Sequence, residues 1–216
     1  MIMIISHEHR KYIAKQEKIG KGRFNGAYYY SQEICRYIIP SVHTDRNWVT
    51  INVPNIGAEH AIVFIHNNLH PNVYDWLSKY NDLILVCGIP ETVEKVRHLG
   101  KAIYLPLSVH VADVEPYRCE KTKEIAYIGR RKKRKGIPFP TKTHFIEGLP
   151  RDRFLKEIAK YRKVYAVGRA AIEAKILGCE ILPYDERFPD PSIWNVLDSS
   201  QAAVMLQEKL DEVDGV

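Results

Sequence analysis

Short runs of apolar residues recur through the first half of the chain, and segments with helical periodicity separate them. The runs are rich in Ile, Val and Leu without polar alternation, which is typical of strands buried on both faces of a parallel sheet. We expect such strands at residues 2–5, 49–53, 61–65, 82–87 and 102–105. Helices are expected from Asn25-Gly26 to just before Pro40, from Pro71 to Tyr80 and from Pro90 to Leu99. The polar stretch from Ser6 to Gly26 is predicted to be a long loop.

The same alternation starts again in the second half of the chain. Residues 105–113, followed by Pro116, resemble the crossover between the two domains of GT-B-type proteins, and on that resemblance we place a boundary near Val114 between segments 1–114 and 115–216. Strands are expected at residues 125–128, 143–146, 164–167 and 180–182. A helix led by Pro150 should point Phe154, Leu155, Ile158 and Tyr161 inward, and Asp198 or Ser200 should cap the last helix. The repeated alternation predicts an α/β protein with two Rossmann-like halves.

The stretch from Lys163 to Asp185 has the most specific pattern in the chain. It is predicted to be a strand, a turn at Gly168, a helix that ends at Gly178, and another strand. The start of that helix would present backbone N–H groups and a partial positive charge beside Arg169, an arrangement that suits a phosphate. Glu173, one turn further on, could accept hydrogen bonds from sugar hydroxyls. The alternative is an ordinary helix between two strands.

The net charge of +6 is concentrated at one place. Six consecutive cations follow a predicted strand end at Gly129, and without them residues 116–216 would be slightly acidic. These residues are Arg130, Arg131, Lys132, Lys133, Arg134 and Lys135. Such a run indicates an anionic partner, or else a solvated loop that contacts nothing.

Together, these motifs resemble those of GT-B-type glycosyltransferases. Gly168, Glu173-Ala174 and Gly178 are similar to the nucleotide-sugar signature of that family, and Arg130 with Lys135 is similar to its Arg-x4-Lys pair. The resemblance implies two parallel sheets that face a cleft. It also implies that Arg130, Lys135, Gly168 and Arg169 hold the donor diphosphate while Glu173 holds the ribose. Transfer would need a nucleotide-sugar as co-substrate, with no metal and no other cofactor.

Two features depart from the family pattern. Many retaining members carry another Glu eight residues before the ribose-binding one, where this chain has Tyr165, so inversion is slightly favoured. The chain is also short for two full domains of this type, which implies that some elements are reduced. The donor sugar, its base and the acceptor are not specified by these motifs.

Two histidines follow predicted strand ends and are candidates for the catalytic base. His66 and His7 would lie across the cleft from the donor, where either could deprotonate an acceptor. A structural role for His66 is equally compatible with its position. The spacings His7-x-His9 and His66-x3-His70 lack the carboxylate or cysteine partners of a metal site, so no metal is expected.

Two further hypotheses concern nucleic acid and binding without catalysis. The chain could be a nucleotide or nucleic-acid binding protein that keeps a GT-B-like fold but transfers nothing. Alternatively, the acceptor could be a modified base in DNA, with Arg131, Lys132, Lys133 and Arg134 following phosphates.

The apolar segments also bear on location. No stretch is long enough for a membrane span, and the apolar residues Met1 to Ile5 are followed at once by polar ones, unlike a signal peptide. We therefore expect a cytoplasmic protein. The four cysteines have neither metal-like nor disulfide-framework spacing, so reduced thiols are expected.

Overall fold

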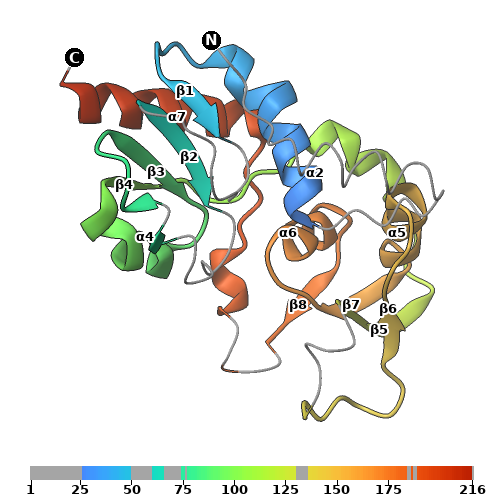
Figure 1. Cartoon of the computed structure of the whole chain (residues 1–216). Coiled ribbons are helices and arrows are strands. Elements are labelled where there is room, and N and C mark those ends of the chain that lie inside the picture. Colours follow the sequence, from blue (N-terminus) through green and yellow to red (C-terminus); the bar gives the residue numbers. More distant parts are fainter. Residues whose placement is uncertain are drawn as a thin grey trace, which may run out of the picture.

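The computed structural model describes two α/β units, each built on a four-stranded parallel sheet (Figure 1). It describes residues 26–49, 60–65, 74–75, 77–129, 136–183, 186 and 189–215. The mixed α/β class and the parallel sheets predicted from the hydrophobic pattern are therefore confirmed. The strand expected at residues 2–5 lies outside the described residues, and so does the loop expected from Ser6 to Gly26, except for Gly26 itself, which is helical.

The first sheet has the strand order β1-β2-β3-β4, with every neighbouring pair parallel. Its strands are β1 (Asn47–Val49), β2 (Ala61–Ile65), β3 (Leu83–Cys87) and β4 (Lys101–Tyr104). Every residue of β2 and β3 is buried, as their continuous apolar sequences predict. The predicted strands agree with β2, β3 and β4 to within one residue. The first of these four strands begins at Asn47, two residues before its predicted start, and residues beyond Val49 lie outside the described part of the chain.

The helical segment before β1 buries the predicted apolar residues, but its helix type changes along the segment. Helix α2 (Gly26–Glu33) continues as a π-helical turn, η1 (Ile34–Ile38), and then as a 3-10 turn, η2 (Ile39–Ser41). Tyr30, Ile34 and Ile38 are buried in the main hydrophobic core, which contains residues of both sheets. The winding that begins at Gly26 ends at Ile38, before Pro40 as predicted, and Pro40 is accommodated in the first turn of the separate 3-10 element.

On its other face the first sheet is covered by α4 (Pro90–Val96), which begins at the predicted proline and buries Val93 and Val96. Gly100 caps the 3-10 turn that follows it, as predicted.

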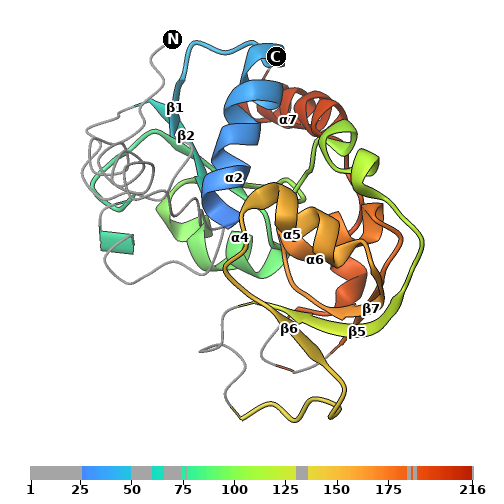
Figure 2. The same cartoon turned by 90° about the vertical axis from the view of Figure 1, so that its right-hand side faces the viewer.

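The second sheet has the order β6-β5-β7-β8, again with parallel neighbours. Its strands are β5 (Lys123–Ile128), β6 (His144–Ile146), β7 (Tyr161–Tyr165) and β8 (Glu180–Leu182). Helices α5 (Arg151–Ile158) and α6 (Arg169–Ile176) lie on one face of this sheet in both views (Figures 1 and 2). Tyr161 was expected on a helix but begins β7, because α5 ends at Ile158 and Tyr161 pairs with Lys123.

The last helix returns to the first unit. Helix α7 (Ser199–Asp214) packs against η1 and η2, with Leu206 and Leu210 buried. Asp198 is its N-cap, as predicted, and accepts a hydrogen bond from the Ser200 N–H within a capping box.

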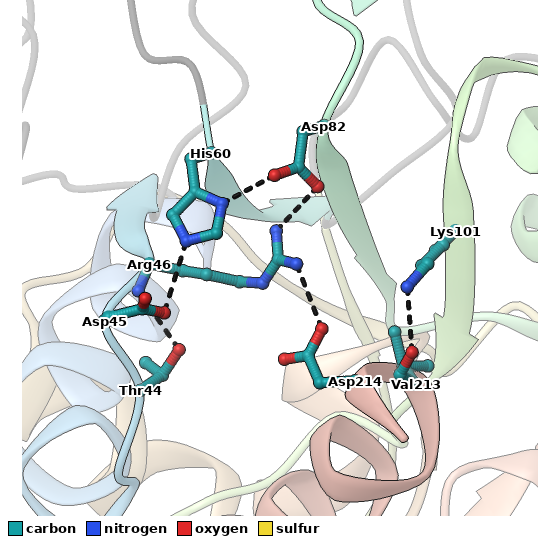
Figure 3. Close-up of polar contacts among 8 residues, drawn as sticks. All are labelled: Thr44, Asp45, Arg46, His60, Asp82, Lys101, Val213 and Asp214. Carbon is teal, nitrogen blue, oxygen red and sulfur yellow. Dashed lines mark hydrogen bonds and ion pairs between the residues drawn. The ribbon is translucent and has the colours of Figure 1, made fainter. Parts of the chain in front are cut away.

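A charged cluster at the amino ends of the first sheet fixes the end of α7 (Figure 3). The buried guanidinium of Arg46 contacts Asp82 at 2.9 Å and Asp214, the last residue of α7, at 3.0 Å. Lys101 at the start of β4 donates to the Val213 carbonyl at 2.8 Å. The first strands and the carboxyl end of the chain's last helix are thus held together by hydrogen-bonded charges.

His60 belongs to the same cluster and has an unusual backbone. Its φ of 52° lies in the left-handed region, and its ring nitrogens contact Asp82 at 2.5 Å and Asp45 at 3.2 Å. Ionised carboxylates only accept hydrogen bonds, so both ring nitrogens donate when the imidazole is protonated. The hydrogen bonds to Asp82 and Asp45 accordingly raise the pKa of His60 above its ordinary value of 6.5.

This raised pKa predicts how stability changes with pH. The contribution of His60 to the free energy of unfolding should be complete below about pH 6.5 and lost as pH rises through the raised folded pKa. His60→Asn should remove that dependence, because Asn adopts left-handed backbone readily but does not titrate. Urea denaturation of both proteins between about pH 5.5 and pH 9 measures it. Exposed His43→Asn is the matched control, and a difference between wild type and His60→Asn that stays constant with pH would refute this assignment.

Candidate functional site

The site begins at the glycine that links β7 to α6. Gly168 has φ 62° and ψ −142°, a conformation that L side chains rarely adopt, and its carbonyl accepts the Ala171 N–H at the start of α6. A Cβ at this position would have only ordinary contact with Leu107, at 3.9 Å. The backbone conformation of the turn, and not a lack of space, therefore requires glycine here.

Leu107 brings the carboxyl ends of the two sheets together. Gly88 follows β3 of the first sheet, and a Cβ there would lie 2.5 Å from Leu107 Cδ2. The same side chain faces Gly168, which follows β7 of the second sheet. The connecting segment between the units therefore passes between two strand ends, the position at which parallel α/β sheets bind ligands.

Glu173 lies one turn into α6 and is held by two arginines. It is 1% exposed. Its Oε1 contacts Arg169 Nε at 2.5 Å and Arg151 Nη1 at 2.6 Å. A carboxylate buried to this degree stays ionised only with such compensation. Glu173 is thus a fixed, oriented acceptor and not a mobile surface acid.

Arg169 also contacts a second carboxylate, from the first unit. Glu33, the last residue of α2, forms an ion pair with Arg169 and accepts from the Ser199 hydroxyl at 2.7 Å. The His110 backbone N–H donates to the same Glu33 oxygen. The guanidinium of Arg169 is therefore shared between the helix that carries it and the first unit.

The burial of these groups changes their proton affinities. Burial raises the pKa of Glu33, against the opposing effects of Arg169 and the Ser199 hydroxyl. For Arg169, burial lowers the pKa, but the charges of Glu173 and Glu33 outweigh it and the net shift is upward. Burial, aided by Glu33, raises the pKa of the neighbouring Tyr30. Arg169 is thus a permanent cation, and Tyr30 is a neutral phenol.

Glu33 and Arg151 were not identified from the sequence. The sequence did contain a signal for Glu33, because Glu33 adjoins the apolar face that Tyr30 of α2 and Ile34 of η1 define. An acid buried at such a face needs a cation as its partner. Arg151 had no such signal, because its pairing depends on how α5 packs beside α6. Its guanidinium also lies 5.2 Å from the ring centroid of Tyr29, which adds a cation–π contact from α2.

The other predicted site residues are not placed by the structure. Gly168, Arg169 and Glu173 are brought together as described above. Outside the described residues lie His7, His66, Arg130, Arg131, Lys132, Lys133, Arg134 and Lys135. The described chain ends at Gly129 on one side of the basic run and resumes at Gly136 on the other.

Comparisons of the chain with protein-family models, with curated proteins and with solved structures give no match. The part of the chain that the structure describes contains no group of three or more His, Cys, Asp or Glu suited to a metal ion. Among the same residues, no helix combines the length and apolar character needed to cross a membrane. Any functional assignment therefore depends on the geometry of the site.

The shared guanidinium predicts a large cost for removing Glu33. Glu33→Ala should lower the free energy of unfolding by about 3–5 kcal/mol, because it leaves a buried cation and two donors without their acceptor. Glu94→Ala is the matched control, since its pair with Arg97 is exposed and should contribute less than about 1 kcal/mol. Urea denaturation at neutral pH measures both. Equal effects of the two substitutions would show that the Glu33 pair does not support the fold.

Proposed function

We propose that the protein is a metal-independent glycosyltransferase of GT-B type that uses a nucleotide-sugar donor. The observation that supports this most is the Gly168–Glu173 unit at the point where the carboxyl ends of two parallel sheets meet at Leu107. A donor bound there would have its diphosphate against the first turn of α6 and its ribose near Glu173. Backbone N–H groups at a helix start suit the diphosphate, and a fixed carboxylate suits vicinal hydroxyls.

The ion pairs suggest different roles for Arg169 and for the cations of the basic run. Because Arg169 is engaged by Glu33 and Glu173, its role in this proposal is to orient Glu173 and to connect α2 with α6. The cations that neutralise the diphosphate as it leaves would be Arg130 and Lys135, which follow β5 in sequence. His66 follows β2 in sequence and is the candidate general base, with His7 as the second.

Isothermal titration with a panel of nucleotide-sugars tests donor binding. Wild type should bind at least one member, and Arg130→Ala should weaken that binding by roughly 10- to 100-fold through loss of a charge-assisted hydrogen bond. Exposed Lys79→Ala is the matched control and should bind like wild type. Glu173→Gln tests the ribose contact and should lower affinity in a protein that still unfolds cooperatively. Failure of wild type to bind any donor would end the proposal.

A binding protein without transferase activity is the second candidate. It is favoured by the ion pairs of Glu173 with Arg169 and Arg151, because these contacts engage the carboxylate that a donor ribose would need. Donor hydrolysis separates the two candidates, because a transferase releases free sugar slowly with water as the acceptor. We expect hydrolysis that Arg130→Ala abolishes and Lys79→Ala retains. Donor binding without hydrolysis would support the second candidate instead.

A further inference from the structure

The two arginines that contact Glu173 are held differently. Arg169 forms ion pairs with both Glu173 and Glu33, and its side chain is 10% exposed. Arg151 pairs with Glu173 alone among the described residues, through one contact of 2.6 Å, and its side chain is 21% exposed. Moving Arg169 would break two buried ion pairs, whereas moving Arg151 breaks one and brings its charge closer to water. Arg151 is therefore the arginine that can leave Glu173 at the lower cost.

The fold places Arg151 at the candidate site. Arg151 is the first residue of α5 and Arg169 is the first residue of α6. These helices follow β6 and β7, which run parallel in one sheet, so both begin at the edge where those strands end. Both guanidinium groups contact the same Glu173 oxygen, Oε1. Arg151 thus lies beside the carboxylate to which the proposed function assigns the donor ribose.

Most of the hydrogen-bonding capacity of Arg151 is unused in the described part of the chain. A guanidinium has five N–H donors, and the contact with Glu173 engages only Nη1. The ring of Tyr29 lies 5.2 Å from the guanidinium carbon and interacts with its face, not with its N–H edge. The planar N–H edge of an arginine matches two oxygens of a phosphate. Arg151 can therefore exchange a carboxylate for a phosphate while Tyr29 keeps it beside the site.

The charges of the network allow this exchange. Two arginines, Arg151 and Arg169, face two carboxylates, Glu33 and Glu173, so the four charges sum to zero. If Arg151 turns to an incoming phosphate, Glu173 still has Arg169 as its partner and is not left as an isolated buried charge. Arg151 would supply a contact to one phosphate, and the remaining charge of a diphosphate would be left to the other cations of the proposed site.

We propose that Arg151 is a ligand-binding residue that exchanges partners. It pairs with Glu173 until a nucleoside diphosphate group binds, and then contacts a phosphate oxygen. Its departure leaves Glu173 Oε1 able to accept from a ribose hydroxyl, while Arg169 keeps the carboxylate oriented. The inference rests on the proposed function, because it states how the donor site of that function becomes able to bind.

Isothermal titration with the diphosphates of uridine, guanosine, adenosine, cytidine and thymidine tests the exchange. Arg151→Ala should weaken binding of the diphosphate that wild type prefers by roughly 10- to 100-fold, because a charge-assisted hydrogen bond is lost. Arg151→Lys should weaken it less, since it keeps a positive charge. Arg153→Ala is the matched control: it removes an exposed arginine from the same helix and should bind like wild type.

A double-mutant cycle with Glu173→Gln separates a ligand contact from a positioning role. If Arg151 contacts the phosphate, Arg151→Ala should weaken binding at least as much in the Glu173→Gln protein as in wild type. If Arg151 acts only by orienting Glu173, its removal should have no effect in that background. Thermal unfolding establishes that each variant is folded, and Arg151→Gln repeats the comparison if Arg151→Ala does not fold.

Four outcomes would overturn the inference. These are wild-type affinity in a folded Arg151→Ala or Arg151→Gln, an effect that disappears in the Glu173→Gln background, an equal effect of Arg153→Ala, and no binding of any nucleoside diphosphate by wild type. The donor titration distinguishes this failure from failure of the proposed function. Donor binding that Glu173→Gln weakens and Arg151→Ala does not would leave the donor site in place without the exchange.

Discussion

The buried guanidinium of Arg169 is the interaction on which the arrangement of the two units depends. It takes one carboxylate from its own helix, Glu173, and one from α2, Glu33. Each carboxylate receives further donors, Arg151 at Glu173, and Ser199 and His110 at Glu33. Such a network tolerates little displacement, because any shift leaves charges in a poorly solvating interior. It therefore fixes where α2 lies relative to the start of α6.

This constraint also shapes the candidate site. A carboxylate that binds a ligand must be oriented before the ligand arrives, and Glu173 is oriented by two arginines. The same contacts reduce the net charge near α6, so an anionic ligand would depend on cations from elsewhere in the chain. The six consecutive cations after Gly129 are the largest such source in the sequence.

Most strands and helices could be predicted from the sequence, whereas the ion-pair partners of Glu173 and Arg169 could not. The strands β2 and β3 were predicted closely because continuous apolar runs bounded by turn residues have few alternatives. Gly168 and Asp198 were found because a left-handed turn and a helix cap each demand particular residues. The placement of Tyr161 and the pairing of Arg151 with Glu173 depend on which elements pack together. Local periodicity carries no information about such long-range choices.

The return of α7 to the first unit has a consequence for how the chain folds. Its buried leucines and the contacts of Asp214 and Val213 complete a unit whose strands all precede residue 105. During synthesis the core of the first unit therefore stays incomplete until α7 has been made. Nascent β1–β4 would leave the ribosome with part of their core uncovered. Contacts this distant in sequence slow folding, because a long loop must close before they form.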